Sequence, residues 1–130
     1  MTLTGYQDLV AWQKAMDLVV AAYALARQFP RAEVYGLISQ LQRAAVSVPA
    51  NIAEGRSRRR TKEFLHHLDI AYGSLGEAET HVHLGIRLGY VSVEDTVAFF
   101  ALSSNVGRLL NGLINSLSAK LEAPTSEAGT

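Results

Sequence analysis

The sequence predicts an all-α protein, a single antiparallel up-down-up-down four-helix bundle, from three observations. Apolar residues recur at alternating spacings of three and four along four segments, which is the rhythm of a helix with one buried face. The 130 residues include only three prolines, and the ten glycines rarely cluster, which favours long helices over many short strands. The connections are short, and short connections make neighbouring helices antiparallel. We therefore expect one domain over residues 1–121 and a flexible tail over residues 122–130.

The first helix is expected over residues 8–29. The carboxylate of Asp8 can cap the free N–H groups at its start. At its end, Pro30 disfavours helical backbone at Phe29 and has no N–H group to donate. The apolar stripe of this helix consists of Leu9, Trp12, Met16, Val19, Tyr23 and Ala26.

The other three helices have their own boundary signals. The second is expected over residues 33–55, with a kink at Pro49 and an end at Gly55. The third is expected over residues 62–89, with Thr61 as its N-cap. Ser92 and Asp95 have the spacing of a capping box, so the fourth helix is expected over residues 93–121.

The composition is that of a folded soluble protein. Hydrophobic residues make up 48% of the chain and charged residues 18%, with twelve basic and twelve acidic side chains. The absence of cysteine excludes disulfides and thiolate metal sites, and the first residues lack the pattern of a signal peptide. The longest stretch without a charge, residues 96–107, is too short to cross a bilayer. We expect a cytoplasmic protein that does not enter a membrane.

The predicted fourth helix is apolar around more of its circumference than a bundle helix requires. Between Thr96 and Ala119 it carries a single charge, Arg108. Such a helix would leave an exposed apolar patch on a monomer, so we expect a homo-oligomer whose subunits cover it. The alternative is a monomer in which this helix is more deeply buried. The candidate interface residues are Phe99, Leu102, Val106, Leu109 and Leu113.

Several segments of the chain carry a family resemblance. They are residues 8–15 (DLVAWQKA), Phe29-Pro30 with residues 33–37 (EVYGL), residues 40–55 (QLQRAAVSVPANIAEG), 62–64 (KEF), 70–79 (IAYGSLGEAE) and 88–90 (LGY). In these segments the chain resembles the bacterial four-helix-bundle proteins encoded by intervening sequences in 23S ribosomal RNA genes. The similarity spans about Tyr6 to Tyr90 and fades through the fourth helix.

This resemblance implies a cytosolic, ring-like homopentamer of four-helix bundles without an established catalytic activity. It extends to the related accessory variability determinants of diversity-generating retroelements, which are similar pentamers that partner a reverse transcriptase and bind nucleic acid through basic surfaces. This chain departs from that group in its formal net charge of zero. The neutral charge argues against strong, unaided binding to RNA.

Five of the twelve basic residues lie within seven positions, between the second and third predicted helices. Arginine makes bidentate contacts to phosphate, and counterion release strengthens such contacts. In a ring of subunits, multivalency would strengthen them further. This cluster is a candidate for contact with the backbone of RNA or DNA, or with a nucleic-acid-bound protein; the alternative is a solvated loop. Its residues are Arg56, Arg58, Arg59, Arg60 and Lys62.

Polar residues form a stripe on the second predicted helix and another on the third. If the stripes face each other, Arg43, Asn51, Glu54 and Glu77 could form a partly buried hydrogen-bonded network. Such a network would fix the helix register or the pairing of subunits instead of doing chemistry. The alternative is a plain solvent-facing surface.

No pattern of residues indicates an enzyme. Glu63 and His66 have the Glu-x-x-His spacing of di-iron bundles, but the second motif and the further carboxylates of such a centre are missing. A cysteine nucleophile and a glycine-rich phosphate loop are missing too. We therefore expect no catalytic residue, metal site, cofactor or small-molecule substrate. The sequence favours a non-enzymatic oligomeric binding module, with a purely structural or protein-interaction scaffold as the alternative.

Overall fold

The computed structural model describes residues 5–122, and over that range the protein is all-α, as the sequence predicts. Its four long helices are α1 (Val10–Ala26), α2 (Leu37–Arg58), α3 (Thr61–Arg87) and α4 (Val97–Glu122). Three short 3-10 helices precede or join them, namely η1 (Tyr6–Asp8), η2 (Arg31–Glu33) and η3 (Glu94–Thr96). Apart from Glu122, which ends α4, the predicted tail lies outside the described residues.

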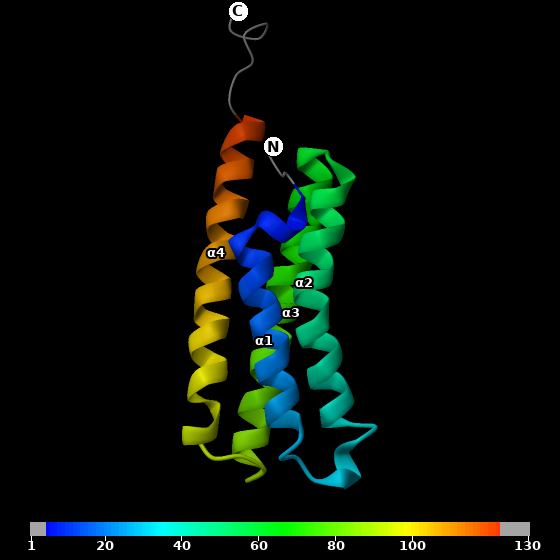
Figure 1. The fold of residues 1–130 in the computed structure, drawn as a ribbon, viewed down its shortest axis with the longest axis vertical. Coiled ribbons are helices and arrows are strands. Elements are labelled where there is room, and N and C mark those ends of the chain that lie inside the picture. The colour runs from blue at the N-terminus through cyan, green and yellow to red at the C-terminus, as the bar shows by residue number, and fades with distance from the viewer. Residues whose placement is uncertain (1–4, 123–130) are drawn as a thin grey trace, which may run out of the picture.

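The four helices lie side by side along one long axis, and successive helices run in opposite directions (Figure 1). Each helix packs against two others, because α1 and α3 both contact α2 and α4. The turn between α2 and α3, the start of α1 and the end of α4 are all at the upper end of the bundle in Figure 1. The predicted arginine cluster lies at this end.

The buried face of α1 differs from the predicted apolar stripe. Met16 and Tyr23 are exposed, with 43% and 37% of their surface accessible. Alanines and two leucines are buried instead, and the alanines let α1 approach its neighbours closely. Trp12 lies at the edge of the core, where its ring meets that of Tyr6 edge-on with centroids 5.2 Å apart. The buried residues of α1 are Ala11, Ala15, Leu18, Ala22, Leu25 and Ala26.

α1 is shorter than predicted at both ends. Asp8 belongs to η1, and the N-cap of α1 is Leu9, which has extended backbone and no capping side chain. The helix ends at Ala26, and in the turn that follows the Phe29 N–H donates to the Ala26 carbonyl at 3.1 Å. Phe29 is buried, so packing of its ring holds this turn against the bundle.

α2 continues through Pro49 and begins at Leu37, later than predicted. The residues before it form η2, which ends at Glu33. The Glu33 carboxylate accepts a hydrogen bond from the Leu37 N–H at 3.1 Å. Glu33 therefore satisfies one of the backbone donors that the first turn of α2 leaves free.

The predicted helix end at Gly55 is wrong. α2 continues to Arg58, and Arg59 ends it with left-handed backbone at φ 69°. Gly55 is buried where α2 meets α3, and a Cβ at this position would lie 2.7 Å from the Cβ of His67. The missing side chain therefore allows close packing near the turn. α3 follows at Thr61, which is its first residue instead of its N-cap.

The turn from α3 to α4 uses two capping motifs. α3 ends in a Schellman motif, in which Gly89 has φ 78° and the Tyr90 N–H donates to the Gly85 carbonyl at 2.8 Å. Ser92 and Asp95 form the predicted capping box, with both of its hydrogen bonds at 3.1 Å. The box lies at the start of η3, which leads directly into α4.

Glu33 and Tyr90 join the connection between α1 and α2 to the end of α3. The Tyr90 hydroxyl donates to the Glu33 carboxylate at 2.7 Å, and the Tyr90 and Phe29 ring centroids are 5.5 Å apart. The hydrogen bond from Tyr90, and after it the one from the Leu37 N–H, lowers the pKa of Glu33. The same bond to Glu33 raises the pKa of Tyr90. Both residues lie in segments that carry the family resemblance, so these segments have a structural role here.

Replacing Tyr90 with phenylalanine will lower the stability of the protein more at neutral pH than in acid. Because the pKa of Glu33 is depressed in the folded state, its stabilising effect is present above the ordinary pKa of 4.5 and disappears as pH falls through the lowered value. Urea unfolding of the wild-type and Tyr90→Phe proteins, at neutral pH and in acid, measures the difference in their free energies of unfolding. Tyr72→Phe is the control, because Tyr72 is exposed and its hydroxyl has only a 3.4 Å contact with Asn111. A stability difference that does not change with pH would contradict this role of Glu33.

Candidate nucleic-acid interface

The predicted arginine cluster lies at the junction of α2 and α3, and three of its residues are on the helices themselves. Arg56 and Arg58 are in the last turn of α2, and Lys62 is in the first turn of α3. Only Arg59 and Arg60 form the turn, and Arg60 is the N-cap of α3. All of these residues except Arg56 are exposed. Two rigid helices therefore hold most of the cluster, in place of the expected loop.

Arg58 differs from the rest of the cluster because it is paired. Its Nη2 donates to Oε2 of Glu54 at 2.8 Å, four residues back on the same helix. This hydrogen bond raises the pKa of Arg58 and lowers the pKa of Glu54. Within the described part of the chain, no ion pair involves the other four cations. They are available to an external anion.

A hollow of about 260 Å³ lies at the ends of α2, α3 and α4. Four cationic side chains line it, and no carboxylate of residues 5–122 does. Lys120, in the last turn of α4, is absent from the predicted cluster because only the packing of α4 brings it to this end. We call this hollow the cationic pocket. Its lining consists of Arg56, Arg59, Arg60, Thr61, Phe64, Leu117 and Lys120.

A second hollow, of about 250 Å³, adjoins the cationic pocket. Arg56 and Arg59 line both hollows, and the second is completed by Ser57 and by Gly5, Tyr6 and Gln7 from the start of the chain. Of the predicted cluster, Arg58 and Lys62 line neither hollow. Three arginines of the predicted cluster and Lys120 therefore line the cationic pocket.

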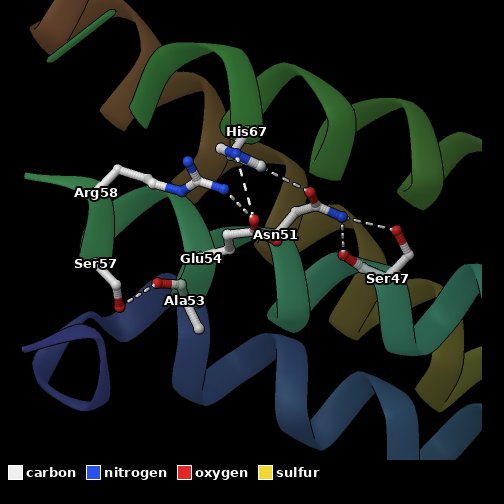
Figure 2. A network of polar contacts seen from close by, with 7 residues as sticks. All are labelled: Ser47, Asn51, Ala53, Glu54, Ser57, Arg58 and His67. Atoms are coloured by element: carbon white, nitrogen blue, oxygen red, sulfur yellow. Dashed lines mark hydrogen bonds and ion pairs between the residues drawn. The ribbon is translucent and has the colours of Figure 1, made fainter. Parts of the chain in front are cut away.

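A chain of polar contacts leads from Glu54 into the interface between α2 and α3 (Figure 2). Nε2 of His67 lies 3.9 Å from Oε2 of Glu54, and its Nδ1 lies 3.0 Å from Oδ1 of Asn51. Asn51 Nδ2 donates to the Ser47 carbonyl at 2.9 Å and to the Ser47 hydroxyl at 3.0 Å. Because the amide nitrogen faces Ser47, the His67 Nδ1–H donates to Asn51. The hydroxyls of Ser47 and Ser74 are 2.8 Å apart.

Of the four predicted network residues, the structure brings together Asn51 and Glu54 but not Arg43 and Glu77. The latter two are exposed and line a separate hollow of about 200 Å³ between α2 and α3. His67 takes their place in the network. Asn51 and His67 each lie eight positions from the left-handed residue that ends α2, and antiparallel helices joined by a tight turn bring such positions together. The network therefore fixes the register of α2 against α3.

Two of the five predicted interface residues belong to the core of the single chain. Phe99 and Val106 are 1% and 0% exposed, so they face the bundle interior. Leu102, Leu109 and Leu113 are only partly buried. An apolar hollow of about 310 Å³ lies between α4 and the start of α1, and it includes two of these leucines. Its lining consists of Leu9, Val10, Ala11, Arg108, Leu109, Gly112 and Leu113.

Among the large apolar side chains of α4, Val97 and Leu121 are exposed, and the others are at least partly buried. In the most apolar 18-residue stretch of Glu94–Glu122, only 22% of the residues are buried. By length and composition this segment could span a membrane, a test that core helices of soluble proteins also pass. Here it packs against α1 and α3.

The histidines form no metal centre within residues 5–122, where no group of three or more histidine, aspartate or glutamate side chains could hold a metal ion. His66, of the Glu-x-x-His spacing, is exposed and stacks edge-on against His67 with ring centroids 5.4 Å apart. His81 lines the hollow beside Arg43, and its Nδ1 is buried without a hydrogen-bond partner among the described residues.

Comparisons with known proteins address the family directly. A model of the 23S rRNA-intervening sequence protein family matches residues 7–112. A search of curated proteins finds no match. The fold is similar to the crystal structure of a protein with unknown function from the S23 ribosomal protein family of Bacteroides thetaiotaomicron VPI-5482, with a TM-score of 0.74 and 24% sequence identity over 81% of this chain and 98% of that chain. The chain belongs to the 23S rRNA-intervening sequence protein family.

Proposed function

We propose that the protein is a non-enzymatic, cytoplasmic, homo-oligomeric binding module that contacts the phosphate backbone of RNA or DNA through its cationic end. The observation that carries this proposal is the cationic pocket, where Arg56, Arg59, Arg60 and Lys120 converge and no carboxylate of the described residues joins them. Contacts to phosphate need positive charge and donors but no base-specific geometry. A protein that itself carries nucleic acid would present the same phosphates.

The neutral net charge is compatible with this function because the charge is unevenly distributed. Six of the twelve basic residues, those of the arginine cluster and Lys120, lie at one end of the bundle. Counterion release depends on the cations that meet the phosphates and not on the charge of the whole protein. The expected binding is therefore weak for one chain and sensitive to salt.

Assembly would strengthen this binding. The apolar hollow between α4 and the start of α1, with the partly buried leucines that line it, is the surface through which we propose that antiparallel up-down-up-down bundles associate. The family resemblance favours a ring-like pentamer. In a ring with its axis along the helices, the cationic ends would lie on one rim, and multivalency would raise the affinity.

Replacing Arg58, Arg59 and Arg60 together with alanine will weaken binding to short RNA and DNA strands by about tenfold or more. The slope of log affinity against log salt concentration will become less steep by about two to three, because each lost phosphate contact reduces the magnitude of that slope by about one. Fluorescence anisotropy titrations at several salt concentrations measure both quantities. Since Arg58 is paired with Glu54, Arg58→Ala alone should weaken binding less than Arg59→Ala.

The matched control replaces Arg27, Arg31 and Arg87, three exposed cations at the opposite end of the bundle. It removes the same total charge but leaves the cationic pocket intact, so it should retain most of the affinity. An equal loss in both triple variants would show that total charge alone matters and would refute the site. A wild-type protein that binds no strand at low salt would refute the nucleic-acid function itself.

The second candidate function is a structural or protein-interaction scaffold without nucleic-acid binding. The pairing of Arg58 with Glu54 favours this scaffold function, because charge pairs within one helix are typical of an ordinary solvent-exposed surface. The same titrations separate the two functions, since a scaffold predicts no salt-dependent binding of either nucleic acid.

A further inference from the structure

The lining of the cationic pocket is more specific than backbone contact requires, and we propose that it binds the phosphorylated end of a single-stranded nucleic acid. This inference rests on the function proposed above and specifies the ligand of the same site. The pocket lies at the ends of three helices and has a volume of about 260 Å³. A chain terminus can enter such a hollow, whereas the continuous backbone of a duplex can only lie across its opening.

The charge of the pocket suits a terminal phosphate better than an internal one. Four cationic side chains line it, and its lining within the described part of the chain includes no carboxylate. A phosphate monoester carries about 1.5 to 2 negative charges near neutral pH, whereas an internal diester carries about one. Thr61 also lines the pocket, and no side chain caps the start of α3, so N–H groups of its first turn are free to donate. More donors and positive charge converge here than a single diester would use.

The apolar side of the pocket indicates a single strand. Phe64 of α3 and Leu117 of α4 are partly buried and line the same hollow as the cations. An unpaired terminal base can stack on the Phe64 ring while its phosphate lies among the cations. A paired terminal base stays stacked within its duplex, so a duplex end would lose this contact.

Lys120 allows the pocket to be tested separately from the arginine cluster. It is an exposed residue of α4, and within the described residues it forms no ion pair. Lys120→Ala therefore removes one charge of the pocket and leaves the junction of α2 and α3 unchanged. Arg87→Ala is the matched control, since Arg87 is an exposed cation at the opposite end of the bundle that does not line this pocket.

The experiment uses the native protein and one short RNA strand, labelled at its 3′ end and carrying either a 5′-phosphate or a 5′-hydroxyl. The phosphorylated strand should bind about tenfold more tightly, because it alone fills the pocket with a doubly charged group. Lys120→Ala should reduce this preference to about threefold or less, and Arg87→Ala should leave it unchanged. A blunt duplex with the same 5′-phosphate should show no preference over its hydroxyl form.

The possible failures can be told apart. Equal affinity for the two strands, with arginine-dependent binding intact, would overturn the inference and leave the proposed function standing. No binding of either strand would overturn both. A preference that survives Lys120→Ala would place the terminal phosphate outside this pocket. If a free nucleoside 5′-monophosphate competes for the pocket as well as the phosphorylated strand does, the ligand is a nucleotide. That result would overturn the inference that the pocket binds the end of a strand.

Discussion

Gly55→Ala is expected to destabilise the protein by about 2 kcal/mol, because the added methyl group would force α2 and α3 apart. A Cβ at this position would lie 2.7 Å from the Cβ of His67 and 3.2 Å from the backbone oxygen of Phe64. Neither atom is at the flexible end of a side chain, so relief requires movement of a helix. Urea unfolding at a fixed protein concentration measures the change in the free energy of unfolding.

Gly73→Ala is the matched control for this prediction. Gly73 lies inside α3, and a Cβ there would meet no atom within 4 Å. Alanine at an unhindered helical position should stabilise the protein by about 0.5 to 1 kcal/mol, because glycine loses more backbone entropy on folding. Opposite signs for the two variants are therefore expected. If Gly55→Ala were as harmless as Gly73→Ala, the close packing of α2 on α3 at Gly55 would be refuted.

Gly112→Lys is expected to reduce the native particle to single chains of 14.1 kDa while keeping the bundle folded. Gly112 is an exposed residue of α4 that lines the apolar hollow, and a Cβ there meets no atom within 4 Å. Within the chain, lysine is a better helix former than glycine by up to about 1 kcal/mol. In an interface, the new ammonium would be buried beside Arg108, and burying an unpaired charge costs several kcal/mol. Sedimentation velocity measures the particle, and circular dichroism checks the fold.

Gly73→Lys makes the same chemical change on α3, away from the apolar hollow. It should raise helix propensity equally and leave the particle mass unchanged. Should Gly112→Lys also keep the wild-type mass, the subunits would have to associate through another surface.

The long helices α2, α3 and α4 are predictable from the sequence because their apolar rhythm is clear, although of their predicted capping signals only the Ser92–Asp95 box is observed. The buried face of α1 is not, because two neighbouring stripes compete there. One holds large side chains such as Trp12 and Met16, and the other holds Ala11, Ala15 and Ala22. The second stripe also contains Leu18 and Leu25, and its alanines let α1 pack closely on its neighbours, so it is this stripe that is buried. Gly55 misleads for the same reason, since a glycine can end a helix or permit close contact.

The arginine cluster is visible in the sequence because its members are adjacent, whereas the pocket is not. Lys120 joins the arginines only because α4 returns to the end of the bundle where α2 turns into α3. The pairing of Arg58 with Glu54 is an i, i+4 contact that the sequence permits but does not require. The role of His67 is not predicted, because the Glu-x-x-His spacing singles out the neighbouring His66 instead. The signal that could have found His67 is its separation from the turn, which equals that of Asn51.

The central claim is that copies of this bundle associate through their uncovered apolar surface and so gather their cationic ends. Light scattering on the wild-type protein as it elutes from a size-exclusion column measures the native mass most directly. The account predicts a stable particle whose mass is a multiple of 14.1 kDa, five chains if the family resemblance holds for assembly. A well-folded particle of one chain mass across the concentrations used for binding would contradict it.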